Sequence, residues 1–117
     1  MNAILLVILL GSSGLAAALE RPTGPVLPSD SKSETVANDI RSELETQLKA
    51  DEISVTKWNV INYRTDISGC CSQNFYIKIQ INDEPDGYVL ASAHIWRSGK
   101  AFFGDYQTRK TLTDPIR

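Results

Sequence analysis

The sequence predicts an α+β fold in which one helix packs on a curved antiparallel β-sheet. Apolar residues recur at helical spacing in the segment that ends near Lys49, and from Ile53 onward they recur at every second position. Turn-forming residues separate the second pattern into short runs. One helix followed by four antiparallel strands excludes a doubly wound α/β fold, so we expect the helix stripe to pack on the apolar faces of the strands.

The first 18 residues are typical of a secretory signal peptide. No charged side chain precedes Glu20, residues 4–10 form a short apolar run, and Ala16, Ala17 and Ala18 supply the small residues of a cleavage site. A membrane anchor is the alternative, but the run is too short to span a bilayer and no second run follows. We expect cleavage near Ala18, secretion to the extracellular space, and no membrane contact afterwards.

The remaining chain divides into an arm, residues 19–32, and a single domain, residues 33–117. The arm contains three prolines, one glycine and several small polar residues, a composition that predicts an extended, flexible segment. A chain of 117 residues supports one small domain. Its net charge of −2 gives no basic footprint, so we expect no nucleic-acid partner.

The expected helix runs from about Glu34 to Lys49. Ser31, with Glu34 three residues later, resembles a capping box. The apolar stripe of the helix consists of Val36, Ala37, Ile40, Leu44 and Leu48. A helix with a single apolar stripe is more often packed on a sheet than used to bind a partner.

Four strands are expected after the helix, at residues 54–65, 75–82, 88–96 and 101–108. The alternation in the second strand places Phe75, Ile77, Ile79 and Ile81 in the core and Tyr76, Lys78 and Gln80 on the opposite face. The segment at residues 83–87 is a turn. In the loop at residues 97–100, Gly99 is the residue best suited to a positive φ.

Catalytic chemistry finds little support in the sequence. The only histidine, His94, lies inside a strand, and the only cysteines, Cys70 and Cys71, are adjacent. Adjacent cysteines form a disulfide only with a strained backbone, and the three residues do not have the spacing of a metal site. We therefore expect no enzymatic activity, no metal and no cofactor. A thiol redox role for the cysteine pair is a minor alternative.

Three segments are candidates for a shared binding edge. They are the arm around Gly24, the first hairpin tip at residues 66–74, and the second tip at residues 96–100. In a meander of this order, alternate hairpin tips lie at the same end of the sheet. Each segment also has a simpler interpretation: disorder for the arm, turn chemistry for the first tip, and a core position for Trp96. Together they favour a protein-binding edge.

Most of the chain after the predicted signal peptide resembles the cystatin superfamily, and specifically its stefin branch. "VANDIRSELETQLK" is similar to the stefin helix, and "FYIKIQINDE" to the stefin strand that reads YFIKV and is followed by Gly-Asp-Glu. "DYQTRKTLTD" is similar to the closing strand that reads NYQT-x-K. The resemblance implies a cystatin-like fold and a reversible inhibitor of papain-like cysteine proteases of the cathepsin type. The inhibitor is expected to act as a monomer.

The resemblance also implies which residues contact the protease. Inhibitors of this family occlude the active-site cleft with an N-terminal arm that contains a glycine, a QxVxG first loop and a second loop. By position, the arm corresponds to Gly24, Val26 and Leu27, and the second loop to Trp96 and Arg97. The first loop corresponds to Thr65, Asp66, Ile67, Ser68 and Gly69 if the glycines are aligned, or to residues 66–70 if the flanking strand aromatics are aligned.

The chain departs from the stefin pattern in three ways. Neither alignment of the first loop retains the glutamine, and the segment Thr65–Asn74 is two residues longer than in stefins, with the extra residues at about Cys70 and Cys71. Stefins usually lack a signal peptide, and the paired disulfides of secreted cystatins are absent. The alternative function is therefore a non-inhibitory extracellular module of the same fold that serves a structural, matrix or ligand-binding role.

Overall fold

A computed structural model describes residues 24–68, 72–97 and 99–116 of the chain. The predicted signal peptide, Gly69 and both cysteines lie outside the described residues. The elements in chain order are β1 (Leu27–Pro28), α2 (Ser31–Ala50), β2 (Asn59–Ser68), β3 (Ser72–Gln80), β4 (Tyr88–Trp96) and β5 (Ala101–Lys110).

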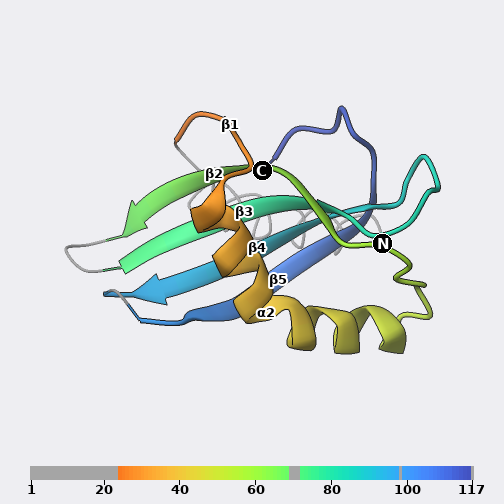
Figure 1. Cartoon of the computed structure of the whole chain (residues 1–117), viewed down its shortest axis with the longest axis horizontal. Coiled ribbons are helices and arrows are strands. Elements are labelled where there is room, and N and C mark those ends of the chain that lie inside the picture. The colour runs from red at the N-terminus through yellow and green to blue at the C-terminus, as the bar shows by residue number, and fades with distance from the viewer. Residues whose placement is uncertain (1–23, 69–71, 98, 117) are drawn as a thin grey trace, which may run out of the picture.

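The described residues form one antiparallel sheet with the strand order β1-β2-β3-β4-β5, and α2 crosses one face of it (Figure 1). This is the α+β arrangement that the sequence predicts, and it is consistent with a cystatin-like fold. The sheet contains one strand more than expected, because Leu27 and Pro28 of the arm pair with Tyr63 and Asn62 of β2. The described arm residues before α2 are therefore extended, as predicted, but Leu27 and Pro28 belong to the sheet, and Ser31 and Lys32, also assigned to the arm, are the first residues of the helix.

Helix α2 starts earlier than predicted, and its cap differs. The N-cap is Asp30, whose carboxylate accepts a hydrogen bond from the Ser33 amide at 2.9 Å, while the Ser33 hydroxyl accepts one from the Asp30 amide at 2.9 Å. The predicted pairing of Ser31 with Glu34 was therefore wrong by one residue. An aspartate side chain accepts a hydrogen bond from the unpaired amide at a helix start as well as a serine side chain does. The sequence "SDSKSE" contains both residue types as possible N-caps.

The strand boundaries follow the prediction most closely where turn residues flank the strand. Strand β4 has the predicted bounds, whereas β2 begins at Asn59 rather than at residue 54 and continues to Ser68. Strand β5 runs two residues beyond the predicted end, to Lys110. The pairing register shifts once between β2 and β3 and twice between β4 and β5, and such bulges bend and twist the strands around the helix.

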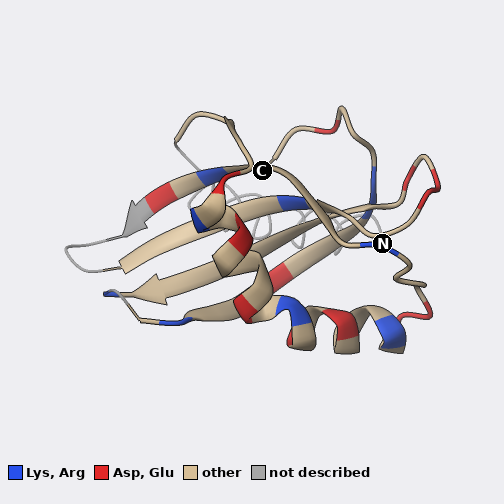
Figure 2. Cartoon of the chain, viewed as in Figure 1, with Lys and Arg blue, Asp and Glu red and all other residues tan. Residues whose placement is uncertain are grey.

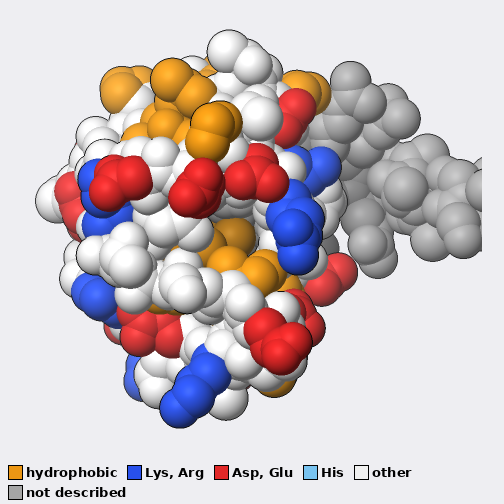
Figure 3. Space-filling view, turned by 90° about the vertical axis from the view of Figure 1, so that its right-hand side faces the viewer, with side chains coloured by type: hydrophobic (Ala, Val, Ile, Leu, Met, Phe, Trp, Pro, Cys, Tyr) orange, Lys and Arg blue, Asp and Glu red, His pale blue; other side chains and the backbone are white. Residues whose placement is uncertain are grey.

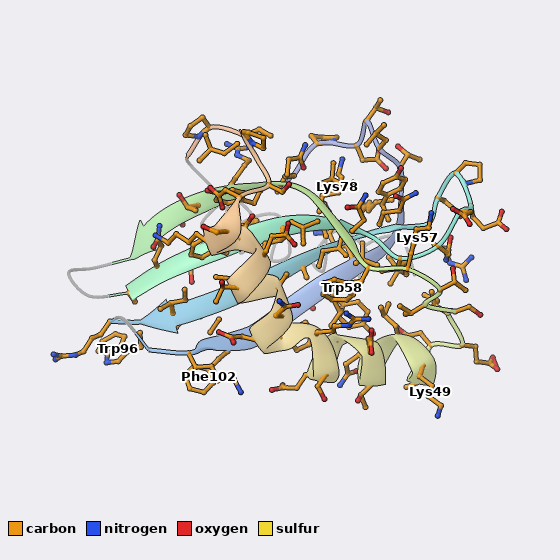
Figure 4. All side chains as sticks on the ribbon, in the orientation of Figure 1. Lys49, Lys57, Trp58, Lys78, Trp96 and Phe102 are labelled. Atoms are coloured by element: carbon orange, nitrogen blue, oxygen red, sulfur yellow. The ribbon has the colours of Figure 1, made fainter. Side chains whose placement is uncertain are left out.

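The core lies between α2 and the sheet. The whole predicted helix stripe is buried, and so are the predicted core-face residues Phe75, Ile77 and Ile79 of β3 and Ile81, which follows the end of the strand. Figure 4 shows Trp58 between the helix and the sheet, with the guanidinium of Arg41 4.9 Å from the centre of its ring. The alternating pattern in β3 therefore predicts the core-facing side of the sheet correctly.

The opposite face of the sheet departs from the prediction at Lys78. This residue is 1% exposed, although the alternation assigned it to the solvent side. The C-terminal segment after β5 covers it: the Lys78 ammonium donates to the Leu112 carbonyl at 2.8 Å and also to the Asp114 carbonyl. Burial lowers the pKa of Lys78, and the Asp114 carboxylate opposes that shift. The predicted tail is thus a packed segment, which we call the strap, Thr111–Ile116.

The helix cap is joined to the sheet through Tyr63. Its hydroxyl donates to the Asp30 carboxylate at 2.6 Å, and its ring stacks on Phe75 with the centroids 5.7 Å apart. The hydrogen bond to Asp30 raises the pKa of Tyr63 to about 12, and the same bond is the main cause of a lowered pKa at Asp30. One contact therefore fixes the start of α2 against β2.

We expect Tyr63→Phe to lower the free energy of unfolding by about 1 kcal/mol, the net value of one hydrogen bond. Because the folded pKa of Tyr63 is about 12 and the ordinary value is 10.0, its contribution is complete below pH 10 and is lost as the pH rises towards 12. Urea titrations at pH 7 and across pH 10–12 measure both effects. Between pH 10 and pH 12 the free energy of unfolding should fall less in Tyr63→Phe than in the wild type. In Tyr88→Phe, a change away from the cap, it should fall as much as in the wild type. Equal alkaline losses in Tyr63→Phe and wild type would contradict this role.

Candidate interaction edge

Both long hairpins end at the same end of the sheet. Ser72, the first residue of β3, lies opposite Ser68 of β2 on one side and opposite Trp96 of β4 on the other. This shared register places the paired ends of the two hairpins side by side, at the left of Figure 1. The prediction that alternate tips meet at one end is confirmed. We call this end, together with the arm beside it, the hairpin edge.

The arm extends the hairpin edge along the free side of β2. The Gly24 amide donates to the Thr65 carbonyl at 3.0 Å, and the Ser29 amide donates to the Ile61 carbonyl at 3.3 Å. Thr65 lies three residues before the end of β2, a distance of roughly 10 Å along a strand. The arm therefore runs antiparallel to β2, and of its described residues Gly24 lies nearest the end of β2 at Ser68.

Gly24 is required for the close approach of the arm to β2. A Cβ atom at this position would lie 2.6 Å from the backbone carbonyl oxygen of Thr65, closer than non-bonded atoms can approach. The contact is with backbone on a paired strand, which cannot move aside as a flexible side chain can. The next arm residues present apolar surface to solvent, with Val26 53% and Leu27 38% exposed.

The second hairpin contributes an exposed aromatic surface. Trp96 is 55% exposed and Phe102 is 63% exposed, and Figure 4 shows both projecting from this end of the molecule. His94 lies beside Trp96 with the ring centroids 6.5 Å apart, and its Nδ1 atom is 2.7 Å from the Asn74 side-chain oxygen. Exposed tryptophan at a strand end is typical of protein-binding surfaces, because its large ring has much apolar area left to bury.

The turn of the second hairpin uses a residue that the sequence did not suggest. Arg97 has a φ of 61°, whereas the prediction gave the positive φ to Gly99. The Gly99 amide donates to the Trp96 carbonyl at 3.3 Å, which closes the turn. A left-handed conformation at a non-glycine residue carries a cost in strain. The role of Arg97 as a contact residue remains a prediction.

The sequence-predicted contact residues fall into three groups. Gly24, Val26 and Leu27 lie on the arm along β2, and Trp96 and Arg97 lie at the second hairpin tip. The segment Thr65–Ser68 was interpreted as part of a loop, but the structure pairs it with residues 72–75 as the last part of β2. The first hairpin is therefore a longer two-stranded projection than a loop starting at Thr65 would give.

Charges are spread over the described surface, and no basic stripe appears on the face in Figure 2. At the hairpin edge, Asp66 lies near the end of β2, and Arg97 and Lys100 flank the second tip. The edge is thus apolar at Trp96, Val26 and Leu27, with single charges of both signs around it.

A hollow among the described residues lies at the other end of the sheet. It has a volume of about 480 Å³ and is formed by the link between α2 and β2, the turn between β3 and β4, and the end of β5. Ile53, Ile81 and Val89 contribute apolar lining, and Glu84 and Asp86 are on the lining as well. Figure 3 shows this end, with acidic side chains near a hollow that has hydrophobic side chains inside. The hairpin edge, by contrast, projects outward.

Among the described residues, no group of three or more His, Cys, Asp or Glu side chains is arranged to hold a metal ion. The described part of the chain also contains no helix that is long and apolar enough to cross a membrane. A scan against protein-family models found no match for this chain, and a search of curated proteins found none either.

We expect Gly24→Ala to separate the arm from β2 while leaving the domain folded, because the new methyl group would overlap the Thr65 carbonyl. Limited proteolysis should cleave the arm several times faster than in the wild type, with a change in Tm of less than about 4 °C, below 1 kcal/mol for a domain of this size. Gly99→Ala is the matched control, since its Cβ would lie 3.5 Å from the Trp96 oxygen, an ordinary contact. Equal cleavage rates for the two variants would contradict the close approach.

Proposed function

We propose that the protein is a secreted, reversible inhibitor of papain-like cysteine proteases that occludes the active-site cleft with its hairpin edge. The single observation that carries the proposal is the meeting of both hairpin tips at one end of the sheet, with the arm running beside them on β2. This arrangement supports the three-part wedge that the resemblance to stefins implies. Secretion rests on the predicted signal peptide, residues 1–18.

The shape of the hairpin edge suits occlusion. It projects from the sheet and is held by paired backbone, so little conformational entropy is lost when a protease binds it. The first hairpin is paired as far as Ser68 and Ser72, so its described part is a two-stranded ribbon up to those residues. The arm is paired with β2 before any contact with a protease, and Val26 remains exposed for that contact.

The apolar residues of the hairpin edge give the proposed contact its binding energy. Trp96 is more than half exposed in the free protein, so it has a large area to bury in a cleft. Tryptophan residues at the centre of an interface are common hot spots, and truncation of one costs 2 kcal/mol or more. Asp66 and Arg97 lie beside this apolar surface and would contribute to the choice of protease through complementary charge.

The experiment that tests the proposal is a titration of papain, and of a cathepsin, with the chain that begins at residue 19. We expect inhibition that is reversible on dilution, with a constant on the order of nanomolar or below, because protease–inhibitor complexes of standard interface size are among the tightest known. The absence of inhibition at micromolar concentration would reject the proposal. In that case the non-inhibitory extracellular module would be the function to pursue.

We expect Trp96→Ala to weaken inhibition about thirtyfold, because 2 kcal/mol corresponds to that factor. Lys49→Ala is the control: Lys49 is an exposed residue in the last turn of α2, and Figure 4 shows it at the opposite end of the molecule from Trp96. The control should inhibit as the wild type does. A Trp96→Ala protein with unchanged inhibition would remove the second hairpin from the proposed contact.

A further inference from the structure

Arg64 lies on β2 between the arm and the strap, and it binds the backbone of both. Its Nε atom donates to the Gly24 carbonyl at 2.7 Å, and its Nη1 atom donates to the Ile116 carbonyl at 3.0 Å. These two carbonyls lie 92 positions apart in the sequence (116 − 24). A guanidinium presents several donors in a fixed planar fork, so it can hold both at once.

The arm has few other described contacts at Gly24. Strand β1 is only two residues long, Leu27 and Pro28, and edge pairing of that length is weak on its own. Beyond it towards the N-terminus, the described backbone bond of the arm is the one from the Gly24 amide to Thr65. The bond from Arg64 is charged, and such bonds are roughly twice as strong as neutral ones. Arg64 is therefore a major contact of this part of the arm.

The strap, by contrast, is anchored without the arm. The Lys78 ammonium donates hydrogen bonds to the Leu112 and Asp114 carbonyls. The Asp114 carboxylate accepts a hydrogen bond from the Thr111 amide at 2.7 Å. Ile116 is 2% exposed. Because Ile116 is buried, its carbonyl is held in place, and its hydrogen bond with Arg64 orients the Arg64 side chain towards the arm.

We propose that Arg64 is the positioning residue of the N-terminal arm, and that the strap sets the position of the arm through it. The effect on protease binding rests on the proposed function, but the effect on the arm does not. An arm held in place before binding loses less freedom on binding, which slows dissociation of the complex. The C-terminal strap, which does not belong to the hairpin edge, would thus control one of its three parts.

The first test is amide hydrogen exchange, read residue by residue by NMR, and it requires no protease. Arg64→Gln should speed exchange at the Gly24 amide about tenfold, the change that corresponds to loss of one hydrogen bond to a charged group. Exchange at the core residues Ile77 and Ile79 of β3 should remain as in the wild type, which shows that the fold is intact. Arg41→Gln, on α2 and paired with Glu45, is the matched control.

Unchanged exchange at Gly24 in Arg64→Gln would overturn the proposal. The role of the strap has its own variant, Lys78→Met, which removes the ammonium group beneath the strap and keeps the apolar length of the side chain. It should also speed exchange at Gly24, by a smaller factor than Arg64→Gln. Exchange at Gly24 equal to that of the wild type would show that the strap does not act on the arm.

The second test is a double-mutant cycle of inhibition constants with Gly24→Ala. Each single variant should raise the inhibition constant for papain about tenfold. The inhibition constant of the double variant should be no higher than the higher of the two single-variant values, because both changes act on the same arm. Additive losses would mean that Arg64 acts elsewhere. If the wild-type protein does not inhibit, the proposed function fails, and the exchange experiment still decides the role of Arg64.

Discussion

The packing of the helix stripe on the apolar face of the sheet is the constraint on which the rest of the structure depends. Side chains alternate between the faces of a strand, so burial of Phe75, Ile77 and Ile79 beneath α2 fixes which face of β3 points inward. A slip of one residue would expose this whole set to water. The core thereby fixes the register that places Ser72 between Ser68 and Trp96. The alignment of the two hairpin tips is a consequence of the core.

The other face of the sheet is organised by polar contacts rather than by apolar burial. Lys78 and Arg64 project from neighbouring strands and bind backbone carbonyls of the strap, and Arg64 also binds the arm. A buried cation is tolerated only when acceptors surround it, and the strap supplies them to Lys78. Arg64 thus joins the arm at Gly24 to the strap at Ile116, across the face that the helix does not cover.

The sequence could predict the core face but not the covering of the opposite face. The helical stripe and the alternation in β3 are local patterns, and both predict burial correctly. The burial of Lys78 depends on Leu112 and Asp114, which lie 34 and 36 positions further along the chain, and no periodicity predicts such a contact. The pairing of Leu27 with Tyr63 was missed for the same reason, since a two-residue strand next to proline has no pattern of its own.

The most direct measurement of the central claim is a hydrogen-exchange footprint of the protein bound to papain. We predict slower exchange at Gly24–Leu27, at the tip of the first hairpin and around Trp96, with exchange at residues 82–87 of the opposite end unchanged. Protection confined to that opposite end, or no protection at any position under saturating papain, would contradict the claim that the hairpin edge is the surface that binds the protease.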